Sequence, residues 1–454
     1  MSNKKIIKGT MVLGVAGLIS KFLGIFLKIP LQRLIHDDGM GIFSLPFPIY
    51  TIMLSISIIG LPAAISKMIS EKMALGDYRG ATRVFKISFY IIIGLGLLSS
   101  CLLFYGAAYM ITLLDWPEQT YHCIKALAPA PFFVSIMSAF RGYFQGMQIM
   151  TPTALSQIVE QLGRVIIGIS LAYIYIGKGI GHAAAGASFG ATGGAFLGAL
   201  LLLFYYLTQG KSLGDASPYT YTRQGNDTII IIKNLVCIAI PISCGAILSS
   251  VMVLVDSIIV PGRLLGAGYT LEGATILYGR LTGKAITLTN VPLSFSTAIA
   301  ASLVPAISEA NSKGNTKELK KRIQTGIKIT TLIALPSAIG IYILSNPIIH
   351  LLWGSKEAGG DILKVLAGNI LFIAIAQTLT AILQGLNKAF VPVKNLFLGV
   401  IVKIIVSYFL LATHLNIVGA VVGSICGYII VVILNYREVK KSISLTIPLK
   451  NVVL

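Results

Sequence analysis

The chain has 454 residues, of which 55% are hydrophobic and only 11% are charged, and its mean hydropathy is +0.85. This composition excludes an ordinary soluble globular fold, in which about a quarter of the residues are charged. The formal net charge is +20, and the position of the positive residues decides whether it indicates a nucleic acid or a membrane surface as partner.

Apolar runs of membrane-spanning length follow one another along the chain. An α-helix needs about 20 mostly apolar residues to cross the hydrocarbon core of a bilayer. Twelve such runs, bounded by charged or turn residues, lie at 8–34, 42–66, 84–112, 121–146, 152–177, 182–208, 229–260, 276–305, 323–352, 362–385, 391–413 and 416–435. We predict an all-α polytopic membrane protein with about twelve transmembrane helices.

Short motifs from the first half of the chain return in the second half. Ile69-Ser70-Glu71 and Gly76 return as Ile307-Ser308-Glu309 and Gly314, at an offset of 238 residues. At nearly the same offset, Gln145-Gly146 and Pro152 return as Gln384-Gly385 and Pro392. Arg164 corresponds to Lys403 in the second half. Six spans per copy is an even number, so both copies begin on the same side of the membrane. We therefore predict two pseudo-symmetric six-helix lobes that form parallel repeats, an architecture typical of transporters.

A polar connector rich in Gly, Ser, Thr, Tyr and Asp separates the sixth and seventh runs. It divides the chain into an N-lobe (1–208), an inter-lobe linker (209–228), a C-lobe (229–436) and a basic tail (437–454). A linker permits relative motion of the lobes, and an amphipathic segment on the membrane surface is the alternative interpretation.

The positive residues lie on one side of the predicted membrane. Clusters flank the first two spans, follow spans 6, 8 and 10, and end the chain; they include Lys4, Lys5, Lys8, Lys72, Arg79, Arg83, Lys86, Lys211, Arg223, Lys313, Lys317, Lys320, Lys321, Arg322, Lys388, Lys394, Arg437, Lys440 and Lys441. The opposite loops are short and carry Asp37-Asp38, Asp115 and Glu118. The positive-inside rule places both termini in the cytoplasm. The net charge is then explained by loops beside anionic lipids, and no nucleic-acid partner is needed.

Motifs for covalent chemistry or metal binding are missing from the sequence. The five cysteines contain no C-x-x-C pair, which favours buried thiols over a disulfide or metal site. The Gly-Lys of Gly283-Lys284 is followed by Ala285, which does not match a nucleotide-binding loop. We predict no catalytic residues, no metal and no cofactor, with an ion (Na⁺ or H⁺) or the membrane potential as a possible source of coupling.

Charged residues inside the predicted spans are the candidate site, because each costs about 2.5–3.5 kcal/mol at the centre of a membrane helix. They are Lys21 and Lys28 in span 1, Glu160 and Arg164 in span 5, Asp256 in span 7, Arg280 and Lys284 in span 8, and Lys403 in span 11. Lys21 with Lys28, and Arg280 with Lys284, have spacings that place each pair on one helix face. If spans 1 and 8 face each other, these four cations line one cavity that attracts an anion.

Structural interpretations compete with that hypothesis. Each of the four cations can instead extend its charged end to a lipid headgroup. Glu160 and Arg164 have the i,i+4 spacing of an ion pair within one helix. Arg141, near the cytoplasmic end of span 4, is interpreted as a topology anchor or as a guide for a headgroup at the cytoplasmic entrance. Asp256 is either an exposed carboxylate or an ion-coupling one.

Several motifs together resemble one family of exporters. They are Ser20-Lys21-Phe22-Leu23-Gly24, Lys28-Ile29-Pro30, Gly39-Met40-Gly41-Ile42-Phe43, Gly60-Leu61-Pro62-Ala63-Ala64-Ile65-Ser66-Lys67, Arg141-Gly142-Tyr143-Phe144-Gln145-Gly146, Thr151-Pro152-Thr153, Glu160 to Arg164, and Leu303-Val304-Pro305-Ala306-Ile307-Ser308-Glu309. The series resembles the stage V sporulation protein B group of polysaccharide exporters. That group belongs to the multidrug/oligosaccharidyl-lipid/polysaccharide superfamily and is related to the lipid II flippases.

The resemblance implies two six-helix lobes that flip an undecaprenyl-pyrophosphate-linked sugar by alternating access, in the cell membrane. Lipid II flippases keep basic residues in spans 1 and 8 that face a central cavity, and Lys21, Lys28 and Arg280 match those places. Lysine stands for arginine at the first two, so the planar bidentate fork is lost there. Many relatives have fourteen helices, so this chain is either a shorter member or a sequence that stops early. We expect a monomer with an anionic lipid-linked sugar as its substrate.

Two rival functions remain open from the sequence. A multidrug or cation antiporter of the same superfamily, coupled to H⁺ or Na⁺, needs buried carboxylates, and only Glu160 and Asp256 are available. A membrane-bound glycosyltransferase needs catalytic acids on a sizeable outer loop, and the outer loops here are short.

Overall fold

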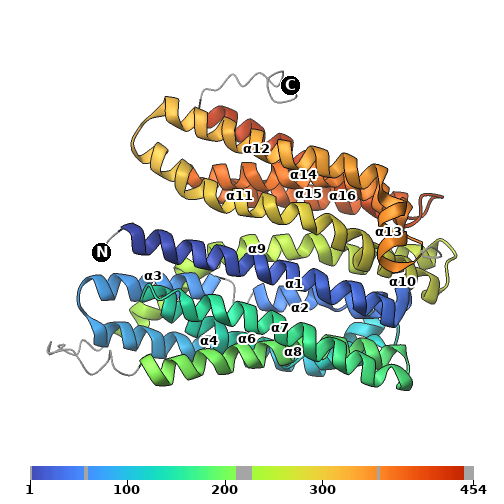
Figure 1. The fold of residues 1–454 in the computed structure, drawn as a ribbon, viewed down its shortest axis with the longest axis horizontal. Coiled ribbons are helices and arrows are strands. Elements are labelled where there is room, and N and C mark those ends of the chain that lie inside the picture. The colour runs from blue at the N-terminus through green and yellow to red at the C-terminus, as the bar shows by residue number, and fades with distance from the viewer. Residues whose placement is uncertain (1–2, 56–59, 211–226, 355–357, 444–454) are drawn as a thin grey trace. The chain divides into compact units, whose positions relative to one another are not determined.

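The computed structural model describes residues 3–55, 60–210, 227–354 and 358–443. These residues form helices and turns, with no β-strand among them (Figure 1). They group into two compact units, Met1–Ser250 and Val251–Leu454, and the division falls inside one long helix, α9 (Asp227–Gly266).

The first unit contains the helices that precede α9, together with the first part of α9. They are α1 (Asn3–Ser44), α2 (Phe47–Leu54), α3 (Gly60–Ala74), α4 (Tyr78–Leu114), α5 (Thr120–Leu127), α6 (Ala130–Gly146), α7 (Thr151–Tyr175) with the short turn η2 (Ile176–Lys178), and α8 (Ile180–Tyr205) with η3 (Tyr206–Gly210).

The second unit contains the remainder of α9 and the helices that follow it. They are α10 (Leu271–Gly279), the π-helical turn η5 (Arg280–Ala285), α11 (Ile286–Ser312), α12 (Thr316–Ile343), α13 (Ser345–Trp353), α14 (Gly360–Gly385), α15 (Phe390–Leu410) and α16 (Ile417–Ile443).

Eleven helices of the described residues are long and apolar enough to cross a membrane, which confirms the predicted all-α membrane fold. The predicted second run, 42–66, is divided among the end of α1, α2 and α3, with residues 56–59 outside the described part. The division follows from proline, since α2 begins directly after Pro46 and a proline is accommodated at the start of a helix but not in its middle.

The predicted linker 209–228 lies almost wholly in residues 211–226, outside the described residues, and so does the end of the predicted tail. The two compact units divide about twenty residues beyond the end of that linker, within α9. The physical reason is packing: Ile231, Leu235 and Ala239, on the first part of α9, are buried in the core of the first unit.

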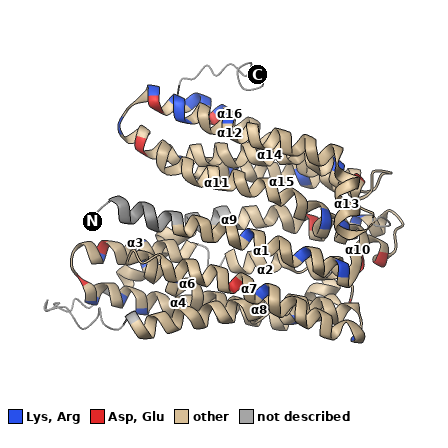
Figure 2. Cartoon of the chain, viewed as in Figure 1, with Lys and Arg blue, Asp and Glu red and all other residues tan. Residues whose placement is uncertain are grey.

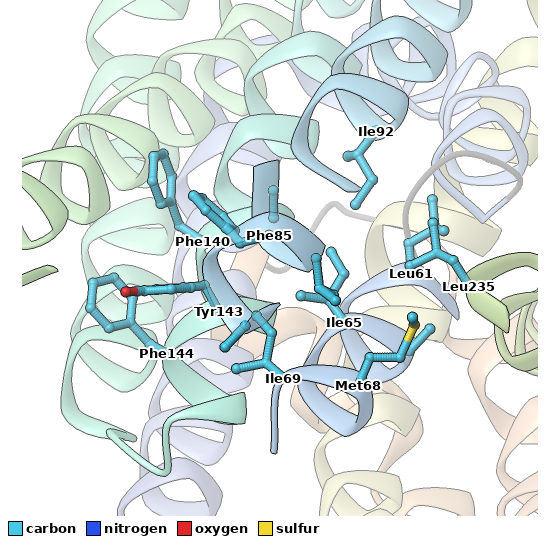
Figure 3. Packing of buried hydrophobic residues seen from close by; sticks show 14 of the residues in the cluster. Leu61, Ile65, Met68, Ile69, Phe85, Ile92, Phe140, Tyr143, Phe144 and Leu235 are labelled. Atoms are coloured by element: carbon cyan, nitrogen blue, oxygen red, sulfur yellow. The ribbon is translucent and has the colours of Figure 1, made fainter. Parts of the chain in front are cut away.

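That core gathers aromatic and aliphatic side chains from α3, α4, α6 and α9. Ile65 and Ile69 of α3 lie beside Phe85 of α4 and Tyr143 of α6 (Figure 3). The ring centroids of Phe85 and Tyr143 are 4.6 Å apart, within the range for favourable aromatic pairs. These contacts hold α3, α4 and α6 together as one packed group.

The sequence repeat corresponds to a repeated helix crossing. A Cβ atom added at Gly146, the last residue of α6, would lie 2.8 Å from Cβ of Ile69 and 2.9 Å from the Ser66 carbonyl oxygen. At Gly385, the last residue of α14, it would lie 2.7 Å from Cβ of Ile307 and 2.9 Å from the Val304 carbonyl oxygen. Both glycines therefore permit the same close approach of two helices, once in each unit.

The turn after each repeated Ile-Ser-Glu triplet is also the same. Gly76 and Gly314 have φ values of +71° and +65°, which glycine adopts without strain. The next residue caps the following helix: Asp77 accepts a hydrogen bond from the Gly80 amide, and Asn315 accepts one from the Glu318 amide. The echoed motifs thus encode shared turns and crossings.

Alanine at Gly146 or Gly385 is expected to destabilise the protein, because the new Cβ meets backbone that cannot move without shifting a helix. Overpacking of this kind costs about 1–3 kcal/mol. Thermal unfolding of the detergent-solubilised protein measures the effect. Gly94→Ala and Gly368→Ala are matched controls, since nothing lies within 4 Å of a Cβ at either position; equal melting temperatures for both sets would contradict the crossing.

Candidate functional site

Two of the candidate cations lie on α1 in the first unit. Lys21 and Lys28 are seven residues apart, close to two helical turns, so they share one face as predicted. The Lys21 side chain is exposed and that of Lys28 is partly buried, beside Leu27, which is buried against α7. Both lysines have polar or electrostatic partners within the protein.

The other two cations lie in the π-helical turn η5 of the second unit. Lys284 is completely buried, and its Nζ donates a hydrogen bond to the Ala358 carbonyl oxygen at 3.0 Å. A Cβ at Gly359 would lie 3.4 Å from Cδ of Lys284 and 3.9 Å from Cβ of Arg280. The pair therefore packs against the segment that leads into α14, and Lys284 holds that segment. The cavity that we predict between the two pairs remains a prediction.

A carboxylate with two arginines forms what we call the Glu160 cluster, inside the first unit. Arg141 of α6 is 3.0 Å from Oε2 of Glu160, while Arg164 is 3.8 Å from Oε1. Arg141 also donates from Nε to Oγ of Ser156 at 2.9 Å. The side chains of Glu160, Arg141 and Arg164 are 13%, 16% and 21% exposed, so the cluster is largely shielded from solvent.

Glycines of α8 allow α7, the helix that carries Glu160 and Arg164, to pack closely against α8. A Cβ at Gly190 would lie 2.6 Å from the Arg164 carbonyl oxygen, and one at Gly193 would lie 2.6 Å from a methyl carbon of Ile167. Small residues at such crossings let membrane helices pack backbone to backbone. The α7–α8 crossing therefore fixes the rotation of α7 that turns Glu160 toward Arg141.

A second buried ion pair, the Lys403 pair, lies in the second unit. Nζ of Lys403 on α15 donates to Oδ2 of Asp256 on α9 at 2.8 Å and to the Met252 carbonyl oxygen at 2.6 Å. The two side chains are 4% and 11% exposed. Asp256 is therefore buried and paired, so the expectation of an exposed carboxylate is wrong, while an ion-coupling role stays a prediction.

The sequence predicted the Glu160–Arg164 pair, which the structure contains, but gave Arg141 only as a topology anchor or a guide for a headgroup. It indicated neither the Arg141–Glu160 contact nor the Lys403–Asp256 contact. The i,i+4 spacing predicted Glu160 with Arg164, whereas the shorter contact is to Arg141, nineteen residues away on another helix. The Lys403–Asp256 contact spans 147 residues, and no local spacing indicates it. The sequence held one indication of these contacts. A charge inside an apolar span is costly unless it is paired, so Asp256 and Lys403 each needed an opposite charge nearby.

Charged residues gather mainly toward the helix ends of each unit, with few along the helix middles (Figure 2). Among the described residues, no group of three or more His, Cys, Asp or Glu side chains is placed to hold a metal ion. Cys101, Cys123, Cys237 and Cys426 are free thiols.

Comparison with known families decides the classification. A model described as polysaccharide biosynthesis protein matches residues 6–311, more than half of the chain, and one described as MatE matches residues 282–409. The chain belongs to the polysaccharide biosynthesis protein family. The family resemblance that the sequence motifs indicated is thereby confirmed.

Two relatives from Bacillus subtilis (strain 168) align over nearly the whole chain. Stage V sporulation protein B is 29% identical over 453 residues, which cover 99% of this chain and 86% of the relative. Lipid II flippase MurJ is 28% identical over 458 residues, which cover 97% of this chain and 83% of the relative.

Solved structures establish the fold. An inward-facing multidrug resistance MATE family transporter of the MOP superfamily superposes with a TM-score of 0.75 at 15% identity, covering 93% of this chain and 98% of that chain. A MATE structure in the bent conformation gives 0.68 at 14% identity. This family member is therefore a multi-pass membrane protein with the fold of the MATE transporters.

Removal of Glu160 is expected to destabilise the N-lobe strongly, because Glu160→Gln leaves two largely shielded guanidinium groups without their carboxylate. Breaking a buried ion pair by removing one partner costs about 3–5 kcal/mol. Arg141→Ala is expected to cost more than Arg164→Ala, since Arg141 makes the shorter contact and also binds Ser156. Thermal unfolding in detergent measures all three, and a larger loss for Arg164→Ala would refute the assigned geometry.

Proposed function

We propose that this protein moves an undecaprenyl-pyrophosphate-linked cell-wall or polysaccharide precursor, resembling lipid II, from the inner to the outer leaflet by alternating access. The proposal is supported by alignment of nearly the whole chain with a relative named as a lipid II flippase and by the transporter fold. The partners are then the anionic lipid-linked sugar and the surrounding bilayer, and the protein acts as a monomer.

The observation that carries the proposal is that both carboxylates inside the predicted spans are already paired with cations. Glu160 is held by Arg141 and Arg164, and Asp256 is held by Lys403. Both acids therefore already have a cationic partner. A cationic drug or a coupling ion would have to displace a buried arginine or lysine to bind either of them, which argues against the antiporter alternative.

The remaining charges inside the spans favour an anionic substrate. Lys21, Lys28 and Arg280 supply positive charge at the places where lipid II flippases keep basic residues. A pyrophosphate bound there gains charge-assisted hydrogen bonds, which are stronger than those between neutral groups. With both termini in the cytoplasm, an interior-negative potential drives negative charge outward by about 2.3 kcal/mol per charge per 100 mV, so the potential alone helps export.

A cell depleted of its lipid II flippase tests the substrate class. The intact chain is expected to restore growth, and the triple variant Lys21→Ala, Lys28→Ala, Arg280→Ala is expected to fail. Each lost contact to a charged group removes about 1.5–3 kcal/mol, so the three together weaken binding by at least about 1,000-fold. Colony formation after depletion is the measurement.

The control for that variant removes three exposed cations elsewhere, Lys317, Lys321 and Lys364. It changes the net charge equally and is expected to support growth. Full rescue by the triple variant in α1 and η5 would refute the cationic substrate site. Failure of the intact, correctly inserted chain would refute a lipid II-like substrate.

Cysteine labelling tests the proposed orientation. In a variant without the five native cysteines, Glu118→Cys is expected to react with a membrane-impermeant maleimide on intact cells, because its loop is outside. Lys313→Cys is expected to react only after permeabilisation. Both positions are exposed in the structure, so burial does not limit either reaction. The reverse pattern would place the termini outside.

A further inference from the structure

The two units neutralise their equivalent cations in different ways. Arg164 of α7 and Lys403 of α15 are related by the sequence repeat, at an offset of 239 residues. Arg164 has Glu160 one turn earlier on its own helix. In α15 the corresponding position is Gly399, where a Cβ would lie 2.5 Å from a methyl carbon of Val431. The crossing with α16 thus leaves no room for a carboxylate there, and Asp256 of α9 supplies it instead.

The Lys403 ammonium lies in a small group of oxygen atoms. It donates to Oδ2 of Asp256 at 2.8 Å and to the Met252 carbonyl oxygen at 2.6 Å. The second carboxylate oxygen, Oδ1 of Asp256, is buried and makes no hydrogen bond with any described residue. Carboxylate and carbonyl oxygens are also the ligands that bind hard metal cations.

The path of the lysine stem to these oxygens depends on α16. A Cβ at Gly427 would lie 3.2 Å from Cβ of Lys403, and one at Gly423 would lie 3.1 Å from its carbonyl oxygen. Met252, Val255 and Val400 form an apolar cluster around the pair, with Tyr428 packed against it. The ammonium is therefore delivered into an enclosed apolar region, where a lone carboxylate is costly.

From this geometry we infer that Lys403 occupies a site for a monovalent alkali cation in the second unit. The tethered ammonium carries the same single charge as Na⁺ or K⁺ and contacts the same kinds of oxygen. Because it is covalently attached, its occupancy does not depend on the salt outside. The wild-type protein therefore takes up no Na⁺ or K⁺ at Asp256, and removal of the ammonium opens the site. This inference does not rest on the proposed substrate.

The test compares the thermal unfolding of purified full-length protein in NaCl, KCl and choline chloride at constant ionic strength. The wild type is expected to melt at the same temperature in all three salts. Lys403→Ala is expected to be stabilised by Na⁺ or K⁺ in a saturable manner. At about 100 times the dissociation constant, such binding shifts the folding equilibrium about 100-fold.

Two control variants separate a cation site from general salt effects. Asp256→Asn with Lys403→Ala removes the carboxylate as well, so it is expected to fold and to show no difference between salts. Arg164→Ala removes the equivalent cation of the first unit, where Arg141 still holds Glu160 at 3.0 Å. It is therefore expected to gain no response to Na⁺ or K⁺.

If Lys403→Ala unfolds in choline chloride, the yield of monodisperse protein in each salt is measured in place of the melting temperature. The inferred site then requires that Na⁺ or K⁺ restores the yield. An absence of any Na⁺ or K⁺ effect on Lys403→Ala, while the double variant folds, would overturn the inference, because Asp256 would then be neutralised by a proton. A specific Na⁺ or K⁺ response that wild type and Lys403→Ala share would overturn it as well.

Discussion

Pairing of buried charge is the constraint on which the interior of each unit depends. An ionised side chain among membrane helices loses its hydration, and only an opposite charge and good hydrogen bonds compensate for that loss. In the first unit Arg141 and Arg164 converge on Glu160, and in the second Lys403 meets Asp256. Each group joins two helices, so the charges also set how those helices are rotated against each other.

Close helix crossings make these pairs possible. The glycines of α8 bring α7 near enough for Glu160 to lie beside α6, and Gly423 and Gly427 of α16 accommodate the stem of Lys403. A larger side chain at these positions would separate the helices and lengthen the ion contacts, which weaken with distance. In each of the two units, the buried ion contacts therefore depend on the small residues at the helix crossings.

The sequence repeat separates a shared scaffold from charges that differ between the units. Positions that echo across the halves, such as Gly146 with Gly385 and Gly76 with Gly314, make the same crossings and turns in both units. Positions that differ carry the charge: two arginines share one carboxylate in the first unit, whereas one lysine and one aspartate balance in the second.

The sequence by itself determined the membrane class, most of the helical spans, the duplication and the charged residues inside those spans. These follow from local hydropathy, spacing and the energetic cost of intramembrane charge, which need no tertiary information. The tertiary structure decided which charges meet. Arg141 reaches Glu160 from another helix, Asp256 is buried by α15, and Lys284 binds the Ala358 carbonyl. Such contacts join residues 19 to 147 positions apart, and only the packing of the helices brings them together.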